Sequence, residues 1–277
     1  MSSTPDLFGR EKAGGLRWRG ARIDLGTSGY SFPDWKGSFY PADIPQSGML
    51  EYYAGRFGAV EINSTYYRIL PERTTRGMAD RTPDGFTFSV KLHSSMTHDS
   101  TAGDAEWGAF TDMLRPLRES GKLGAVLAQF PWSLRPDGEG MRRLDLVRER
   151  CGGFPLAVEF RHDSWYGDDV LPGLMSSGLN PVTVDLPGMD HLPDRRPLAG
   201  RDFAYVRFHG RNGEQWWDGG PLRYDYLYSP GELKSWLPAI EKLAEATGRV
   251  FMFWNNCHMG KAALNADFMK SLLEGEG

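Results

Sequence analysis

The sequence predicts a single α/β barrel with a (β/α)8 arrangement, in which eight parallel strands alternate with helices. Three observations lead to this prediction. Eight short apolar runs recur along the chain, and helical periodicity fills most of the segments between them. Several runs are near-continuous stretches of Val, Phe, Leu and Ala, as expected of parallel strands that are covered on both faces. The length of 277 residues fits one barrel domain, which needs about 250 residues.

The predicted strands are apolar runs that end in polar residues. They span residues 23–28, 59–63, 86–92, 124–130, 155–160, 181–185, 203–209 and 249–255. An open doubly wound sheet is the alternative arrangement of such units. Its usual G-x-G-x-x-G pattern is absent, because the first strand runs into GTSGYSF.

The strongest predicted helix spans residues 229–248. Ser229 and Glu232 have the spacing of a capping box, Pro230 takes the first helical position, and Gly248 is a typical helix stop. By contrast, residues 186–200 are rich in proline and glycine and predict a loop. We therefore expect the helix between the sixth and seventh strands to be missing or irregular.

Composition argues against several classes of protein. The net charge of −4 gives no sign of the basic surface on which nucleic-acid binding depends. Two cysteines do not make a disulfide scaffold and indicate a reducing, cytoplasmic environment. No apolar stretch reaches the ~18 residues of a membrane span, and the N-terminus lacks the apolar region of a secretory signal. We expect a flexible leader at residues 1–22, with Trp18 on the surface, and a barrel domain at 23–277.

Polar side chains gather at the carboxyl ends of the predicted strands, where barrel enzymes carry their active sites. Residues two apart on a strand share a face, so Glu61 is expected to point the same way as Asn63. The same spacing relates Glu159 to Arg161 and Arg207 to His209. The residues expected at the mouth are Glu61, Asn63, Lys91, Gln129, Glu159, Arg161, His162, Asp185, Arg207, His209, Arg211, Asn255 and Asn256.

The charges of this ring are balanced. Isolated buried charges are costly, so we expect these groups to pair with one another. The carboxylates are Glu61, Glu159 and Asp185, and the cations are Lys91, Arg161 and Arg207. One interpretation is a salt-bridged cap without chemistry. The functional interpretation is a pocket for a polar or anionic small molecule.

Glu159 and Glu61 are the predicted acid/base pair, and His209 and His162 are alternative general bases. Arg161 is expected to keep Glu159 ionised. No metal-binding motif is present and three cations oppose a divalent ion, so no cofactor is predicted. If a metal were bound, its expected ligands would be Glu61, Glu159, Asp185 and His209.

Two features near the mouth leave alternatives open. The long loop after the seventh strand carries five aromatic rings that either stack on a ligand or pack over the rim, namely Trp216, Trp217, Tyr224, Tyr226 and Tyr228. Cys257 follows the eighth strand, and a catalytic role for its thiol would need an activating base.

Eight segments carry a family resemblance. They are GTSGYSFPDWKGSFYP, YYAGRFGAVEINSTYYRI, RTPDGFTFSVKLHSSMTH, LGAVLAQFPWS, LAVEFRHDSW, YVRFHGRN, RYDYLYSPGEL and WNNCHMGKAALNA. With them, the chain resembles the domain of unknown function 72 family, also called YecE-like proteins. The resemblance implies a TIM-type barrel, but it implies no reaction. It places on family motif positions the residues Glu61, Asn63, Tyr66, Gln129, Glu159, Arg161, His162, Arg207, His209, Asn255 and Asn256. Trp254 and Cys257 depart from the FNND or FNNH pattern of many members.

The leading hypothesis is a hydrolase or isomerase that acts on a carbohydrate-like or phosphorylated ligand. Arg161, Arg207 and Lys91 would orient an anionic group, and Asn255 and Asn256 would fix the ligand by hydrogen bonds. One alternative is a nucleic-acid-processing, endonuclease-like barrel that works with or without a metal and uses a local basic surface. That surface would comprise Arg195, Arg196, Arg201 and Arg211. The other alternative is a non-catalytic ligand-binding module.

Overall fold

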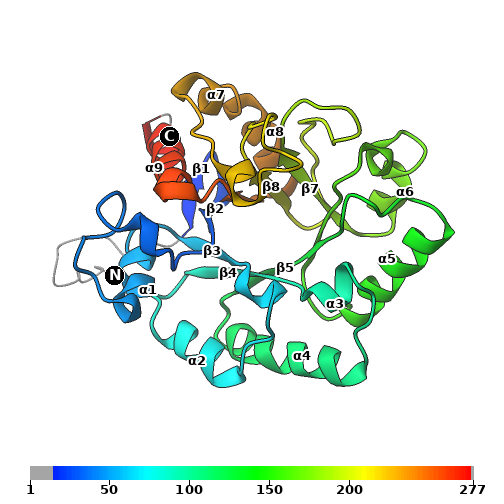
Figure 1. The fold of residues 1–277 in the computed structure, drawn as a ribbon, viewed down its shortest axis with the longest axis horizontal. Coiled ribbons are helices and arrows are strands. Elements are labelled where there is room, and N and C mark those ends of the chain that lie inside the picture. Colours follow the sequence, from blue (N-terminus) through cyan, green and yellow to red (C-terminus); the bar gives the residue numbers. More distant parts are fainter. Residues whose placement is uncertain (1–14, 276–277) are drawn as a thin grey trace.

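The computed structural model describes residues 15–275 and shows a closed barrel of parallel strands with helices around it (Figure 1). Each barrel strand pairs in parallel with the next, and β9 pairs back with β2, which closes the sheet. The barrel strands are β2 (Ala21–Ser28), β3 (Ala59–Ile62), β4 (Thr87–Lys91), β5 (Leu123–Gln129), β6 (Leu156–Glu159), β7 (Asn180–Asp185), β8 (Ala204–Phe208) and β9 (Arg249–Trp254). The predicted α/β barrel is confirmed.

Helices cover the outside of the strands, as Figure 1 shows. They are α1 (Met49–Ala54), α2 (Glu72–Asp80), α3 (Ser94–Thr97), α4 (Asp104–Glu119), α5 (Gly138–Arg150), α6 (Leu171–Ser176), α7 (Pro230–Lys234), α8 (Leu237–Thr247) and α9 (Lys261–Gly275). Residues 186–203, between β7 and β8, contain no helix, as the proline and glycine content predicts. None of the helices in the described part of the chain is long and apolar enough to cross a bilayer.

The predicted helix at residues 229–248 is in fact two helices. Its start and its end are as expected, because Ser229 and Glu232 form the capping box and Gly248 adopts a left-handed conformation with φ of 67°. The break between α7 and α8 falls just before Pro238, which stands in the first turn of α8. Proline has no N–H to donate to the preceding turn, and its ring clashes with the carbonyl four residues back.

The expectation of a flexible leader up to residue 22 is wrong for the residues that the structure describes. Strand β1 (Leu16–Trp18) pairs antiparallel with the start of β2, and Trp18 is buried rather than on the surface. Burial of a large aromatic ring is favourable enough to dock this short hairpin. Residues 1–14 of the predicted leader lie outside the described residues.

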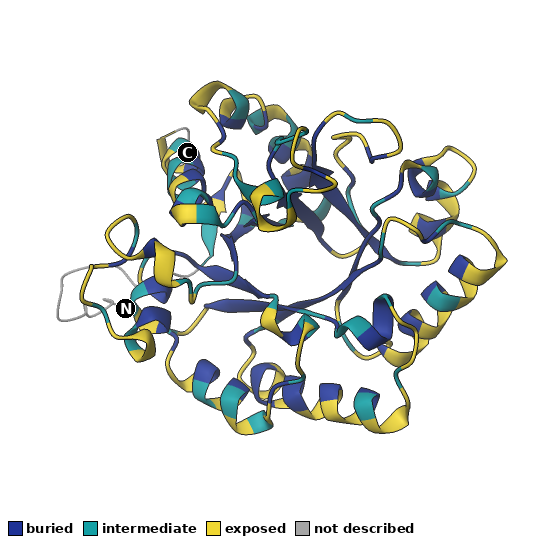
Figure 2. Cartoon of the chain, in the orientation of Figure 1, coloured by how far each residue is buried: buried dark blue, intermediate teal, exposed yellow. Residues whose placement is uncertain are grey.

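The inner face of the barrel is filled by alternate residues of each strand. Figure 2 shows buried strands at the centre and exposed residues on the outer faces of the helices. Ala59, Leu127, Ala157 and Phe253 belong to one buried apolar cluster inside the barrel. The next inward positions along these four strands, two residues further on, are Glu61, Gln129, Glu159 and Asn255. The polar layer therefore lies directly above an apolar one.

Gly26 on β2 has no side chain, so the hydroxyl of Tyr53 can lie between β2 and β3 and bond to both strands. The Tyr53 hydroxyl accepts a hydrogen bond from the Thr27 N–H at 2.7 Å and donates to the Ala59 carbonyl at 3.0 Å. A Cβ on Gly26 would lie 1.8 Å from the Ala59 carbonyl oxygen, which is far inside contact distance.

We expect Gly26→Ala to destabilise the protein by about 3 kcal/mol or more, at the upper end of the range for overpacked cores. The matched control is Gly108→Ala at an exposed position of α4, where nothing lies within 4 Å of a new Cβ. That change should be stabilising by about 0.5–1 kcal/mol. Urea unfolding of both variants checks the prediction, and equal effects would show that the strands yield at Gly26.

Candidate functional site

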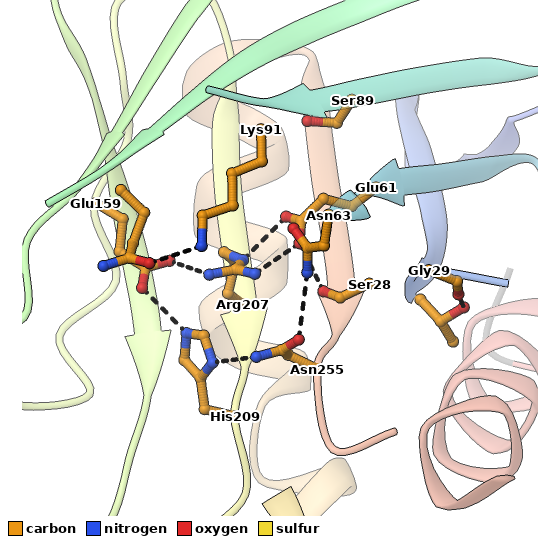
Figure 3. Close-up of polar contacts among 12 residues, drawn as sticks. Ser28, Gly29, Glu61, Asn63, Ser89, Lys91, Glu159, Arg207, His209 and Asn255 are labelled. Atoms are coloured by element: carbon orange, nitrogen blue, oxygen red, sulfur yellow. Dashed lines mark hydrogen bonds and ion pairs between the residues drawn. The ribbon is translucent and has the colours of Figure 1, made fainter. Parts of the chain in front are cut away.

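Arg207 occupies the centre of the polar layer and joins two carboxylates from different strands (Figure 3). Its Nε and Nη2 donate to the two carboxylate oxygens of Glu61 at 2.9 and 2.6 Å, while Nη1 donates to Glu159 at 2.7 Å. All three side chains are almost completely buried. The bidentate geometry is the strongest arrangement available to arginine and a carboxylate.

Glu61 accepts four hydrogen bonds in all. Besides the two from Arg207, Ser28 Oγ donates to Oε1 at 2.6 Å and the Tyr205 hydroxyl donates to Oε2 at 2.7 Å. Tyr205 in turn lies 2.7 Å from Ser89 Oγ, which must then be the donor of that pair. The lone pairs of Glu61 are thus satisfied by the protein, so this carboxylate serves as an anchor for Arg207.

Glu159 carries the charge of the other side of the layer. Its Oε2 pairs with Arg207, and its Oε1 pairs with Arg161 and lies 3.3 Å from His209 Nε2. Burial alone would raise the pKa of Glu159, but Arg161, Arg207 and His209 outweigh it and hold the pKa well below the usual value. Glu159 is therefore ionised, as expected from its neighbour Arg161.

His209 is neutral and has a defined tautomer. Burial, reinforced by Arg161, lowers the pKa of His209 to about 3. Asn255 Nδ2 lies 3.0 Å from His209 Nδ1, so Nδ1 accepts and the ring proton lies on Nε2, facing Glu159. Asn63 Nδ2 donates to Asn255 Oδ1 at 3.4 Å, which extends the chain of contacts to β3 (Figure 3).

Lys91 at the end of β4 is the cation of this layer that has no acidic partner. Its Nζ donates to Gln129 Oε1 at 2.8 Å and lies 4.2 Å from the centroid of the Tyr66 ring. The ion pairs found among residues 15–275 do not include it. Burial, with Arg207 and Arg161 nearby, lowers the pKa of Lys91 to about 7. The two carboxylates balance the two arginines, and Lys91 is the surplus charge.

A cavity of about 390 Å³ lies above this layer. Its lining includes four cationic side chains, Lys91, Arg161, Arg207 and Arg223, and none of the described lining residues is Asp or Glu. The remaining lining residues are Asn63, Tyr66, Tyr67, His98, Gln129, Pro131, Trp132, Leu192, Trp216, Trp217, Tyr224 and Asn255. The cavity thus combines a cationic floor with aromatic walls, which suits a polar anionic ligand.

The two tryptophans of the loop after β8 lie differently. Trp216 is buried in the wall, with the Arg161 guanidinium 5.9 Å from its ring centroid. Trp217 is 45% exposed at the rim and meets Trp132 edge-on at a centroid distance of 5.3 Å. The packing alternative therefore describes Trp216, and Trp217 is the ring that remains open to a ligand.

Asp185 and Arg211 lie apart from the cavity, in contrast to their predicted placement. Arg211 makes a bidentate pair with Asp185 and also contacts Glu232, and Trp236 Nε1 donates to Asp185 at 2.8 Å. The reason is the alternation of side chains along β7. Val182 and Val184 belong to the inner apolar cluster, so Asp185, one residue after Val184, points outward. Gly210, with φ of 89°, turns the chain out of β8 before Arg211.

His162 and Asn256 also lie outside the cavity lining. His162 Nδ1 accepts from the Ser164 N–H at 3.2 Å and so caps the short helix at Asp163–Tyr166. Asn256 is buried and donates to the Tyr226 carbonyl and to Asn265. Both residues follow an inward residue by one position, so their side chains point the other way.

Cys257 has the environment of an unreactive thiol. Its Sγ lies 3.3 Å from the Ser28 carbonyl oxygen, to which the S–H donates. Burial and the negative charge of Glu61 raise its pKa above the usual value. A thiolate is the reactive form, so these surroundings oppose nucleophilic chemistry at Cys257.

The four residues named as conditional metal ligands do not form a ligand set. Arg207 is inserted between Glu61 and Glu159, and Asp185 faces a different region. Within residues 15–275, the one cluster with ligand atoms close enough together is His162, Asp163 and His191, beside the rim. His162 already uses Nδ1 as a helix cap there, so a metal that bound this atom would have to displace that hydrogen bond.

Sequence patterns missed several groups of the site. Tyr205 had a usable signal, because it precedes Arg207 by two positions and shares its inward face. His98, Trp132 and Arg223 had none, because loop conformations bring them to the cavity, whereas Tyr224 belongs to the aromatic loop that the sequence singles out.

Comparisons with known proteins agree with this fold. The family described as "Protein of unknown function DUF72" matches residues 24–277. The chain belongs to the DUF72 family. The UPF0759 protein YunF of Bacillus subtilis strain 168 is 30% identical over 272 residues, which cover 92% of this chain and 95% of that protein.

Solved DUF72 structures are similar over almost the whole chain. A DUF72 family protein from Thermotoga maritima superposes with a TM-score of 0.83 and 38% identity, covering 91% of this chain and 99% of that one. Another from Enterococcus faecalis V583 has a TM-score of 0.81 and 27% identity, covering 91% and 95%. The family's function is unknown, so the chemistry has to be inferred from the site.

Proposed function

We propose that this DUF72 protein is an enzyme that binds a small anionic, carbohydrate-like compound, phosphorylated or carboxylated, in the cavity at the strand ends and isomerises it by acid/base chemistry. The observation that carries the proposal is the unmatched cation of the cavity floor. Glu61 and Glu159 balance Arg161 and Arg207, which leaves Lys91 without an acidic partner. An anionic ligand would complete this balance.

The same geometry favours isomerisation over glycoside hydrolysis. A glycosidase needs two carboxyl groups that flank the scissile bond, with space for sugar or water between them. Here one guanidinium fills the space between Glu61 and Glu159, and neither carboxylate lines the cavity. We therefore assign Glu159 and Glu61 to holding Arg207, with Glu159 also holding Arg161 and His209. Among the lining groups, Lys91 has a pKa of about 7 and so exchanges protons near neutral pH, and the imidazole of His98 can accept a proton.

A nucleic-acid-processing role has less support. Arg211 forms ion pairs with Asp185 and Glu232. Arg201 Nε lies 3.8 Å from Oδ1 of the neighbouring Asp202. Together with Arg195 and Arg196, these residues are absent from the described lining of the cavity. The residues proposed for a basic surface around the mouth therefore add no charge to the cavity itself, which weakens the support for this role.

Calorimetry with inorganic phosphate and with sugar phosphates, each matched by its neutral sugar, tests the proposal at pH 6.5. Arg161→Met is expected to weaken phosphate binding about ten- to a hundredfold, the value of a charge-assisted hydrogen bond. The control is Arg142→Met, since Arg142 lies exposed on α5 and, within residues 15–275, its ion pair is with Glu139. Turnover is then followed by NMR of the bound compounds.

Each outcome decides a different question. Phosphate binding that depends on Arg161, together with turnover of a sugar phosphate, supports the enzyme. Binding without turnover across the panel would favour a ligand-binding module instead. Equal binding of sugars with and without an anionic group would contradict the proposal.

A further inference from the structure

We propose that Lys91 is a nucleophile that forms an imine with the carbonyl carbon of an anionic ketone or aldehyde bound in the cavity. This inference rests on the proposed function and specifies its substrate class, namely a carbonyl compound that carries a phosphate or carboxylate group. Lys91 is the only primary amine among the described lining residues.

The first support is a comparison with a second buried lysine of the same chain. Lys122 donates to the Ala79 carbonyl, the Thr82 carbonyl and Thr82 Oγ1, at 2.6, 2.6 and 3.3 Å. These contacts use all three N–H bonds of an ammonium group, as expected of a structural lysine. Lys91 makes one such hydrogen bond, to Gln129, and so has a pair of electrons to offer once it is neutral.

The second support is the position of Lys91 among other cations. A lysine amine becomes nucleophilic when it is desolvated beside another cationic group. Arg161 and Arg207 are both fixed by Glu159, so they remain in place and charged whether or not Lys91 is protonated. The pKa of Lys91, at about 7, makes the neutral amine abundant at physiological pH.

The third support is the arrangement of the other lining groups. Arg161 and Arg223 can hold an anionic end of the ligand, while Lys91 reaches its carbonyl. His98 lines the same cavity, and burial and Lys91 lower its pKa to about 4. Its imidazole is therefore neutral and able to accept a proton.

The reaction balances without a further co-reactant. The Lys91 nitrogen adds to the carbonyl carbon, and the π-electron pair moves to oxygen. A proton passes from nitrogen to that oxygen, giving a carbinolamine. A proton from solvent, delivered directly or through the neutral imidazole of His98, protonates the hydroxyl and lets water leave as the C=N bond forms. Loss of the last N–H proton returns that proton, so the net products are the imine and one water.

Reductive trapping tests the inference. The intact protein is incubated with dihydroxyacetone phosphate, and separately with uncharged dihydroxyacetone, and each sample is reduced with sodium borohydride. Peptide mass mapping is expected to locate the adduct of the phosphorylated ketone on Lys91, with little on the Lys122 peptide. The yield should rise as the pH passes about 7, where Lys91 loses its proton. Lys91→Arg should abolish the adduct, whereas Lys234→Arg, at an exposed position of α7, should keep both the adduct on Lys91 and phosphate binding.

Calorimetry with inorganic phosphate on the same samples separates this inference from the proposed function. Phosphate binding without an adduct on Lys91 would overturn the imine and leave the anion-binding enzyme standing. Adducts spread over surface lysines, or equal yields from the two ketones, would also overturn it. Loss of both phosphate binding and the adduct would contradict the inference and the proposed function together.

Discussion

Arg207→Met should destabilise the protein by about 3–5 kcal/mol at neutral pH, the cost of leaving a buried charge unpaired. Two carboxylates depend on this guanidinium. Glu61 would lose two of its four hydrogen bonds, and Glu159 would keep only Arg161 and the contact with His209. The free energy of unfolding, measured in urea, checks the prediction.

The loss should depend on pH. The native pKa of Glu159 is depressed below its unfolded value of 4.5, so this group stabilises the fold above that pH and loses its contribution as the pH falls through the native pKa. Arg207 is one of the charges that lower the pKa of Glu159, so this pKa should be higher in the variant than in the wild type. The difference between wild type and variant should therefore narrow as the pH is lowered from 7 towards 4. If the free energies of unfolding of the two proteins differed little at pH 7, or by the same amount at lower pH, Arg207 would not be the group that neutralises Glu61 and Glu159.

Lys91→Met should change how stability depends on alkaline pH. The native pKa of Lys91 is lowered from 10.5 to about 7, so between these values the unfolded chain binds more protons than the native one. The free energy of unfolding of the wild type therefore rises as the pH increases through this window. The reason is that Lys91 takes up a proton on unfolding, and this uptake becomes less favourable at higher pH. The gain is on the order of 2–4 kcal/mol, reduced by the solvent that reaches the cavity.

The measurement compares urea midpoints of the two proteins at pH 6.5, 8 and 9.5. The variant is expected to be the more stable protein at pH 6.5, and the gap should close as the pH rises. Lys122→Met is a poor control because that lysine holds backbone carbonyls, whereas the exposed Lys234→Met leaves the interior unchanged. Parallel pH profiles for wild type and Lys91→Met would contradict the assignment of a lowered pKa to Lys91.

Strand phase explains which parts of the site could be predicted from sequence. Two-residue alternation correctly turned Glu61, Glu159, Arg207 and His209 towards one another, because each lies on a strand whose apolar residues face the same interior. The same rule turns Asp185 outward, because Val182 and Val184 are the inward residues of β7. The end of β7 therefore does not contribute Asp185 to the mouth, contrary to the prediction.

Other features depend on tertiary structure that local patterns do not contain. The capping box at Ser229 was visible, but the split of one predicted helix required attention to Pro238. Trp18 looked like a surface residue because its strand has only three residues and is stabilised by pairing with β2. The cavity walls come from loops, whose conformations depend on contacts with distant segments.

The bonds of Arg207 have a consequence for how the chain can be divided. They join β8 to β3 and β6, across separations of 146 and 48 residues. A fragment that stops before β8 would enclose Glu61 and Glu159 without their shared counter-ion, while the complementary piece would carry a guanidinium with nothing to neutralise it. Neither fragment should fold alone, and the two fragments, when co-expressed, should become soluble only by assembling with each other.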